Sequence, residues 1–522
     1  MTGLLLLFVA AVFASDEVGT KVCAECHASI VTSYARTGMA RSAGAASTLR
    51  LSASGFVHAA SGAEYRMTPN AGGIEMSFAR GESKGRRLLE WFVGSGGLGR
   101  SFLFSKDGFL FQAPVSFYAS VGAWQISPGY ESRRHVDLTR AVETACLQCH
   151  ASQLQPVAGT QNGFGNPPFR EGGVSCERCH GGGRLHVENM RRGLKSTAIV
   201  HPAKLAADAR DSLCAQCHLT GAARIARRNA PRYVPGAKLS DSLAVFVWPQ
   251  LDASPDATSH YERLNRSACK KASGEKLWCG SCHDPHASPV RPAAHYREKC
   301  QSCHRTKPCT ERLAVRNAKQ NDCAACHMPK GESHMVEHVA FTDHGIVRRP
   351  QTGLRPAASR ELSPFFSESD NRDLAMAYSV AAMTEPAVRR KALELLEAAV
   401  AKDATDVAVM AQLAQFYDRL GREEQAAALC EQILKLDPGH NAAAVNLGIY
   451  RVKRGDAAAA IALWKQALLR NPAQTGVRTN LAVALAQSGQ LEAAEAELKI
   501  ALDYDPSAEA AARLLAEIRT RR

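Results

Sequence analysis

The chain has 522 residues, of which 45% are apolar and 22% are charged, as in an ordinary soluble protein. The formal net charge is +14, and all of the excess lies in residues 1–370, because residues 371–522 hold 19 basic and 19 acidic side chains. After the N-terminus no apolar run is long enough to span a bilayer, which excludes a protein built from membrane spans.

The N-terminus predicts a secretory signal peptide over residues 1–14. An apolar run from Leu4 to Phe13 is followed by the small residue Ala14 before Ser15. No Lys or Arg precedes the run, so a membrane-anchoring N-terminus is the alternative. The absence of Cys at the cleavage site argues against a lipid anchor. We expect a periplasmic or otherwise extracytoplasmic protein with no transmembrane span, soluble or membrane-peripheral.

The motif Cys-x-x-Cys-His occurs seven times between residues 23 and 327. In this motif two thiols add to the vinyl groups of a haem, and the adjacent His supplies the proximal nitrogen of the iron. The sequence therefore predicts seven covalently attached haem c groups. The attachment cysteines are Cys23, Cys26, Cys146, Cys149, Cys176, Cys179, Cys214, Cys217, Cys279, Cys282, Cys300, Cys303, Cys323 and Cys326. The proximal ligands are His27, His150, His180, His218, His283, His304 and His327.

Zinc sites and disulfide frameworks also use paired cysteines, but neither requires a His directly after the second Cys. Haem also offers an explanation for the basic region, because each haem brings two propionates that need cationic partners. We therefore expect no nucleic-acid partner. Two cysteines outside the motifs, Cys269 and Cys309, flank the fifth and sixth motifs, and we expect a disulfide between them; two buried free thiols are the alternative.

Ten further histidines lie in residues 1–370, enough to give every haem a second axial imidazole. Met39 is a further candidate, for the first haem, because Met is a known axial ligand. For His135 the sequence favours neither an axial ligand nor an ordinary side chain. We expect His58, His295 and His334 to be ordinary side chains that do not bind iron. The six histidines that we predict as distal ligands are His186, His201, His260, His286, His338 and His344.

About 120 residues without Cys separate the first two motifs, and residues 49–128 predict a small β-rich insertion. Asp107-Gly108 lies between the apolar runs Arg100–Phe104 and Phe109–Gln112, which is a hairpin signal. Residues 129–350 predict short helices and loops around haems.

Residues 351–370 contain Pro, Ser and Gly and predict a linker. After it, a 34-residue period relates Gly421, Gly455 and Gly489, and the same step recurs at Leu, Ala and Pro positions. This is the period of tetratricopeptide (TPR) repeats. Residues 371–522 predict a TPR α-solenoid that folds as a separate unit, with Cys430 in its core and His440 on its surface. The expected repeats are 373–406, 407–440, 441–474 and 475–508, with a capping helix over 507–521.

The segments Cys279-Gly-Ser-Cys-His-Asp-Pro-His, Gly173–His180 and Cys326-His-Met-Pro-Lys330 resemble bacterial multihaem cytochromes related to the hydroxylamine-oxidoreductase and tetrahaem cytochrome families. The likeness is to secreted proteins that carry TPR repeats after the haem region. It implies electron transfer through closely packed haems that mostly have two His ligands. Every motif here ends in His, so the Lys ligand of pentahaem nitrite reductases has no counterpart.

The sequence thus predicts a mainly α-helical chain: a multihaem cytochrome c region over residues 15–350, a β-rich insertion and a TPR solenoid. We expect an extracytoplasmic electron carrier whose TPR region docks a redox protein partner. The alternative is a multihaem oxidoreductase that acts on a small nitrogen or sulfur compound at a haem with an open site.

Overall fold

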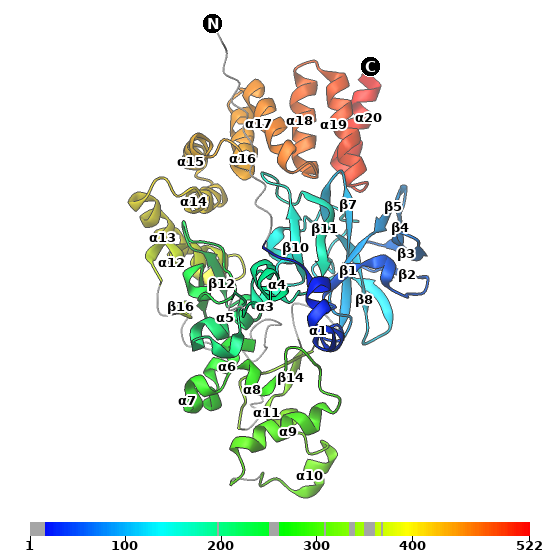
Figure 1. Cartoon of the computed structure of the whole chain (residues 1–522). Helices are drawn as coiled ribbons and strands as arrows, with labels where there is room; N and C mark the ends of the chain where they lie inside the picture. Colours follow the sequence, from blue (N-terminus) through cyan, green and yellow to red (C-terminus); the bar gives the residue numbers. More distant parts are fainter. Residues whose placement is uncertain are drawn as a thin grey trace.

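The computed structural model describes residues 16–195, 198–249, 260–306, 309–332, 340–348, 361–366 and 369–521. The expected signal peptide, most of the expected linker and the histidines His334 and His338 lie outside these ranges. The described part contains a β-rich region near the N-terminus, a central region of short helices and a C-terminal run of paired helices (Figure 1). The predicted fold class is confirmed.

The β-rich region consists of two antiparallel sheets, one with the order β2-β3-β4-β5 and one with the order β1-β6-β7-β8-β9. Side chains alternate between buried and exposed along β3, and Tyr65, Met67, Met76, Phe102 and Phe111 form part of the shared core. The strands are β1 (Ala43–Ala45), β2 (Ser54–His58), β3 (Ala63–Asn70), β4 (Gly73–Arg80), β5 (Ser83–Leu89), β6 (Trp91–Val93), β7 (Gly99–Lys106), β8 (Phe109–Tyr118) and β9 (Ala123–Ile126).

The hairpin predicted at Asp107-Gly108 is confirmed. Strands β7 and β8 pair up to Lys106 and Phe109, and the two residues between them both have positive φ, 52° at Asp107 and 80° at Gly108. Such a two-residue turn matches the twist of the strands that it joins. Asp107 of this turn contacts Tyr504 of the repeat region.

The central region contains more strand than the sequence predicted. Besides short helices, its described residues hold three small sheets, formed by segments between motifs and by segments that follow the seventh motif. These strands are β10 (Ala151–Pro156) with β11 (Phe164–Gly172), β12 (Ala223–Ala226) with β13 (Leu243–Val247) and β16 (Ser363–Pro364), and β14 (Lys330–Glu332) with β15 (Ala340–Thr342). Helices without a motif are α4 (Arg184–Arg191), α6 (His260–Arg266), α7 (Ala268–Ser273) and α10 (Leu313–Ala318).

The C-terminal region is a stack of antiparallel helix pairs. In the pairs that begin with α14, α16 and α18, the first helix ends before a glycine with positive φ: 71° at Gly421, 81° at Gly455 and 77° at Gly489. A left-handed residue at this position ends a helix and costs least with glycine. The helices are α12 (Asn371–Ala381), α13 (Arg389–Lys402), α14 (Val407–Arg419), α15 (Glu423–Leu436), α16 (Asn441–Lys453), α17 (Ala457–Arg470), α18 (Thr475–Gln487), α19 (Leu491–Tyr504) and α20 (Glu509–Arg521).

Cys430 and His440 lie in the repeats, and the sequence predicted the first in the core and the second on the surface. Cys430 is 1% exposed in the core, and burial raises its pKa to about 12, as expected for a structural thiol. His440 is not a surface residue. It is half-buried, and its Nδ1 accepts the backbone N–H of Ala443 at 3.2 Å, so that it caps helix α16.

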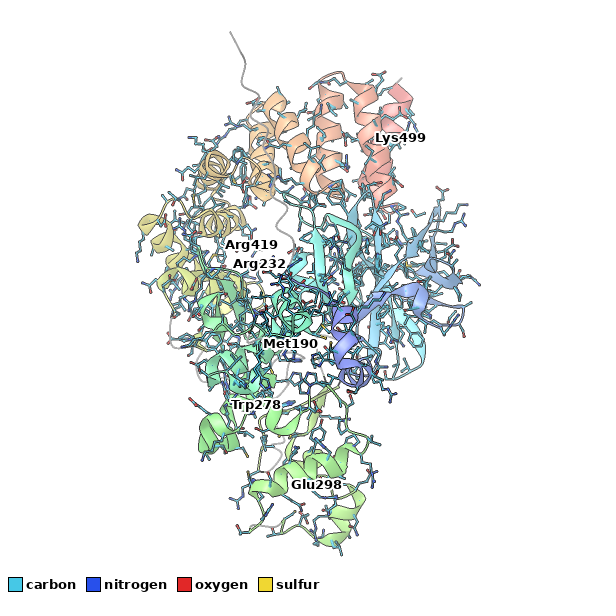
Figure 2. The ribbon with its side chains drawn as sticks, viewed as in Figure 1. Met190, Arg232, Trp278, Glu298, Arg419 and Lys499 are labelled. Carbon is cyan, nitrogen blue, oxygen red and sulfur yellow. The ribbon has the colours of Figure 1, made fainter. Side chains whose placement is uncertain are left out.

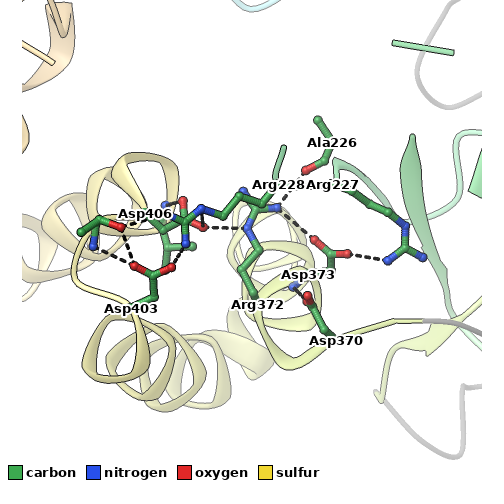
Figure 3. Close-up of polar contacts among 10 residues, drawn as sticks. Ala226, Arg227, Arg228, Asp370, Arg372, Asp373, Asp403 and Asp406 are labelled. Carbon is green, nitrogen blue, oxygen red and sulfur yellow. Dashed lines mark hydrogen bonds and ion pairs between the residues drawn. The ribbon is translucent and has the colours of Figure 1, made fainter. Parts of the chain in front are cut away.

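The first helix pair of the repeats shares a core with the central region. Ala375, Ala377 and Tyr378 of α12 belong to the same buried cluster as Ile225 of β12 and Phe246 of β13. A polar network adds to this contact, as Figure 3 shows. Within it, the Arg372 guanidinium donates to Asp406 at 2.9 Å, to Asp373 at 2.9 Å and to the carbonyl of Ala226 at 2.8 Å.

The last helix pair contacts the β-rich region. The Tyr504 hydroxyl donates to the Asp107 carboxylate at 2.8 Å, and its ring lies against Phe111 with centroids 6.0 Å apart. Lys106 in the same hairpin pairs with Asp503 at 2.6 Å. The Ser507 hydroxyl donates to the Val136 carbonyl at 2.7 Å.

The repeat region therefore contacts the rest of the chain at both ends, and its folding as a separate unit stays a prediction. The expected linker differs, because its described part contains β16, which pairs with β13, and the buried Leu362. Among the described residues, no helix combines the length and apolarity needed to cross a bilayer.

Candidate haem sites

Each Cys-x-x-Cys-His motif lies on or directly beside a helical turn, which brings its two cysteines, three residues apart, to one face. The His follows at the point where helical geometry ends: His27 has φ −116° inside α1, and His283 and His304 follow the last residues of their helices. The helices are α1 (Thr20–Tyr34), α2 (Thr144–Leu147), α3 (Glu177–His180), α5 (Ala207–His218), α8 (Cys279–Cys282), α9 (Pro292–Cys303) and α11 (Ala324–His327).

The motifs lie next to one another although they are far apart in sequence. In four cases a thiol of one motif lies close enough to a thiol of another to shift its pKa: Cys23 with Cys176, Cys149 with Cys217, Cys214 with Cys279, and Cys300 with Cys323. In the first pair, the neighbouring Cys23 thiol lowers the pKa of Cys176 to about 7. In addition, the Gln216 side chain donates to the Arg178 carbonyl at 3.0 Å, which links the fourth motif to the third.

These contacts connect the first five motifs with one another and the sixth motif with the seventh. Trp278, which precedes the fifth motif, lies in the lower half of the molecule, and Glu298, on the helix of the sixth motif, lies below it in the lower lobe (Figure 2). Lys499 on α19 lies at the opposite end (Figure 2). Groups bound by neighbouring motifs would therefore be neighbours as well.

The histidine surroundings fit an axial ligand of iron. Nδ1 of His180 lies 2.8 Å from the Val200 carbonyl oxygen, and Nδ1 of His327 lies 2.9 Å from that of Val347. A carbonyl oxygen can only accept, so Nδ1 carries the proton and Nε2 keeps a lone pair for a metal. Metal-binding histidines ordinarily have this outer hydrogen bond.

Burial keeps several of these rings neutral, as ligation requires. It lowers the pKa of His150, His180, His218 and His283. Nδ1 of His150 is buried and has no protein partner, which marks a site that the protein alone does not complete.

Predicted distal ligands meet the predicted proximal ligands in two places. The rings of His180 and His286 have centroids 5.9 Å apart and planes 16° apart, and those of His283 and His344 have centroids 6.2 Å apart and planes 32° apart. An iron held between two imidazole nitrogens at roughly 2 Å each separates the ring centres by about 6 Å. The centroid spacing of both pairs matches this value.

His260 lies in the same group of rings. Its centroid is 5.3 Å from that of His218 and 4.6 Å from that of His344. Burial, together with the nearby rings of His344 and His218, lowers its pKa to about 3, and its Nδ1 has no protein partner. His344 itself donates from Nδ1 to the Thr342 carbonyl at 2.9 Å, so its Nε2 is free.

The other predicted distal ligands in the described residues, His186, His201 and Met39, differ in burial and in their contacts. His186 on α4 is half-buried with an unpartnered Nδ1, whereas His201 is exposed beside His180. Met39 is half-buried, and its carbonyl accepts the Val174 N–H at 3.0 Å. Met39 thus lies beside the third motif and not only near the first, for which it was predicted.

Three other histidines have local explanations. Both ring nitrogens of His58 are hydrogen-bonded, to the Ser61 hydroxyl at 2.9 Å and to the Glu131 carbonyl at 3.0 Å. Nε2 of His295 lies 3.2 Å from the Cys282 carbonyl, and His135 lies near Asp505 of the repeats. All three agree with ordinary roles.

The disulfide expected between Cys269 and Cys309 is wrong, because both thiols are free. They lie in different surroundings. The nearest cysteines to Cys269 belong to the fifth and sixth motifs, and Cys309 lies near Cys323 of the seventh.

The sequence did not reveal the outer contacts of the motifs. The Tyr296 hydroxyl lies 3.2 Å from Nδ1 of His283, and the Tyr34 hydroxyl donates to the Val174 carbonyl at 2.6 Å. The carboxylate of Glu177, inside the third motif, accepts three backbone N–H groups. No spacing rule would have found these partners, since most of them lie far away in the sequence.

A fold with adjacent Cys-x-x-Cys-His turns and paired imidazoles, followed by stacked helix pairs, defines a multihaem c-type cytochrome with a protein-binding repeat array. The comparisons agree. The family model for cytochrome c554 and c-prime matches residues 121–181, which contain the second and third motifs, and the tetratricopeptide repeat model matches residues 390–447 and 451–518. The predicted union of a cytochrome c region with TPR repeats is confirmed.

Solved structures of MamA also match. A MamA fragment from Desulfovibrio magneticus RS-1 is 22% identical with a TM-score of 0.27, and covers 29% of this chain and 86% of its own. Another MamA crystal structure is 16% identical with a TM-score of 0.26, and covers 28% of this chain and 80% of its own. No curated protein sequence matches the chain.

Proposed function

We propose that the chain is an extracytoplasmic electron carrier that holds seven haem c groups and uses its repeat region to bind a redox protein partner. When bound, haem c supplies one-electron oxidation and reduction. The protein's part is to attach each group through two cysteines, to fix the axial ligands and to hold neighbouring groups close together.

The observation that carries the proposal is the pairing of imidazoles, His180 with His286 and His283 with His344, at a spacing that fits one iron. Catalysis at a metal needs an exchangeable position for the substrate. Electron transfer needs the opposite, two fixed ligands that move little when the oxidation state changes. Paired rings favour the carrier over an oxidoreductase that acts on a small nitrogen or sulfur compound.

Intact-mass measurement tests the cofactor count and the export. Protein matured in a host that attaches haem should carry seven haem additions and lack residues 1–14. Replacing both Cys300 and Cys303 with Ser should remove one haem mass. Cys309→Ser is the matched control, because this exposed thiol lies outside the motifs and its loss should remove none.

Ligand exchange tests the function itself. The reduced protein should bind almost no carbon monoxide and should not consume nitrite or hydroxylamine in a sustained way. One equivalent of carbon monoxide-binding haem together with steady consumption of either compound would establish the oxidoreductase instead.

A further inference from the structure

The helix that carries the first haem motif begins against two carboxylates from the third-motif region. Helix α1 starts at Thr20, and α3, with the third motif, lies beside it (Figure 1). Four backbone N–H groups at the start of a helix have no partner within that helix, and the helix dipole favours negative charge there. Here the acceptors come from residues about 150 positions further along the chain.

Glu177 is the more deeply placed of the two. It lies between the cysteines of the third motif and is only 4% exposed. Its carboxylate accepts the N–H of Val18 at 2.7 Å, of Gly19 at 2.9 Å and of Gly183 at 2.8 Å. One side chain thus joins the segment before α1 to the glycine turn that follows the third motif.

Glu171, at the end of β11, completes the contact. Its carboxylate accepts the backbone N–H of Thr20 at 2.5 Å and the Thr20 hydroxyl at 3.0 Å. A Cβ on Gly19 would lie 2.9 Å from a Glu171 oxygen, and Gly19 has φ 87°, so glycine is the residue that allows this approach. Hydrogen bonds to charged acceptors are about twice as strong as neutral ones.

The two motifs meet directly behind this contact. The Cys176 thiol lies 3.8 Å from the Thr20 hydroxyl, and the Cys23 thiol is near enough to Cys176 for each to shift the pKa of the other. A shift at the start of α1 would therefore move the first motif relative to the third.

We propose that Glu177, assisted by Glu171, is a positioning residue that sets the placement of the first haem against the third. The inference rests on the proposed function, since it requires haem at both motifs. It concerns no substrate, because both carboxylates are occupied by backbone N–H groups.

Full-length haem-loaded protein provides the test, with Glu177→Ala and the nearly isosteric Glu177→Gln. Glu25→Gln is the matched control: Glu25 also lies between the cysteines of a motif, but it is exposed and contacts Arg191 at the surface. Hydrogen exchange at Val18, Gly19 and Gly183 should speed up about tenfold or more in E177A and less in E177Q, because the amide keeps one acceptor oxygen. E25Q should not change it.

A redox titration and the low-temperature electron paramagnetic resonance spectrum give the decisive readout. In E177A the half-potentials of two haems should shift and their resonances should change, while E25Q matches the wild type. Two results for E177A would overturn the inference. One is faster hydrogen exchange with an unchanged redox titration and spectrum. The other is unchanged hydrogen exchange at Val18, Gly19 and Gly183. Should E177A fail to mature, E177Q must show the same changes in smaller size, or the inference falls.

Peptide mapping of the haem-bearing cysteines in the wild type distinguishes a failure of this inference from a failure of the proposed count of seven haems. A missing haem at the first or third motif overturns both this inference and the count of seven. A missing haem at another motif overturns the count alone, and the E177A comparison still decides the role of Glu177.

Discussion

The rings of His180 and His286 lie 5.9 Å apart and nearly parallel, although one belongs to the third motif and the other follows the fifth motif by three residues. Two segments separated by about a hundred residues therefore contribute to one site. We predict from this arrangement that His286, in the fifth-motif loop, would supply the second ligand of a haem bound at the third motif.

We expect His286→Ala to keep all seven haems and to create one haem that binds carbon monoxide when reduced, because one iron loses its second fixed ligand. Titration with carbon monoxide, followed by visible absorption, measures this. His135→Ala is the control, since His135 lies near Asp505 in the repeats and should leave the spectrum unchanged. An H286A spectrum equal to that of the wild type would contradict the assignment.

Arg372→Ala should weaken the attachment of the first repeat. It removes one arginine partner from each of the buried Asp373 and Asp406 carboxylates, which keep Arg227 and Arg228, and the loss of hydrogen bonds to a charged group costs about 2 kcal/mol. Burial alone would raise the pKa of Asp406, yet the bonds from Arg372 and the Val409 N–H hold it below its usual value. Hydrogen exchange of the α12 amides gives the local free energy of unfolding.

The control for that experiment is Arg390→Ala on α13. Arg390 pairs with Glu394 at 3.6 Å, but its side chain is 92% exposed, and such pairs contribute at most about 1 kcal/mol. Equal effects of R372A and R390A on α12 would show that the network in Figure 3 does not hold the first repeat in place.

Deleting residues 371–522 should prevent accumulation of soluble haem-loaded protein, because the deletion uncovers Phe246 at one end of the contact and Phe111 at the other. Deleting residues 509–521 alone removes only α20 and leaves Tyr504 in place, so it should be tolerated better. Haem content per polypeptide in the soluble fraction measures both. A full deletion with normal yield and spectrum would show that the shared cores are dispensable.

The repeat region should be less stable in mild acid because of His440. Burial lowers the pKa of His440, and its Nδ1 must stay unprotonated to accept the Ala443 N–H. A folded pKa below the unfolded value of about 6.5 gives stability that is complete above that pH and is lost as the pH falls through it.

His440→Asn should keep the cap and remove most of this pH dependence, whereas His440→Ala should cost about 1 kcal/mol at neutral pH. Exchange of the Ala443 amide between pH 5 and 8 measures the effect. The hypothesis fails if wild type and H440N show the same dependence on pH.

The sequence was most informative where structure is local or periodic. The 34-residue step located the helix-ending glycines Gly421, Gly455 and Gly489, and Asp107-Gly108 located the hairpin, because in both cases the backbone conformation depends on a few adjacent residues. The cytochrome c region was predictable for the same reason, since cysteines and proximal His are adjacent in the chain.

Contacts between distant segments were not predictable. Nothing near His286 indicates that it meets His180, and nothing near Tyr504 indicates that it meets Asp107. The strand β16 was missed because two paired residues are too few to produce an alternating pattern, and Glu177 was missed because its backbone partners can be any residue type.

The attachment of the helical stack at Ala226 and at Asp107 fixes more than its orientation. The distance between these two contact points has to match the length of the stack of helix pairs that joins them. Most helical repeat arrays can gain or lose a repeat with little loss of stability, because each repeat contacts only its neighbours and one end of the array makes no other contact. Here the insertion or deletion of one 34-residue repeat would break the contact at Ala226 or the contact at Asp107. Evolution could therefore change the surface residues of the repeats far more readily than the number of repeats.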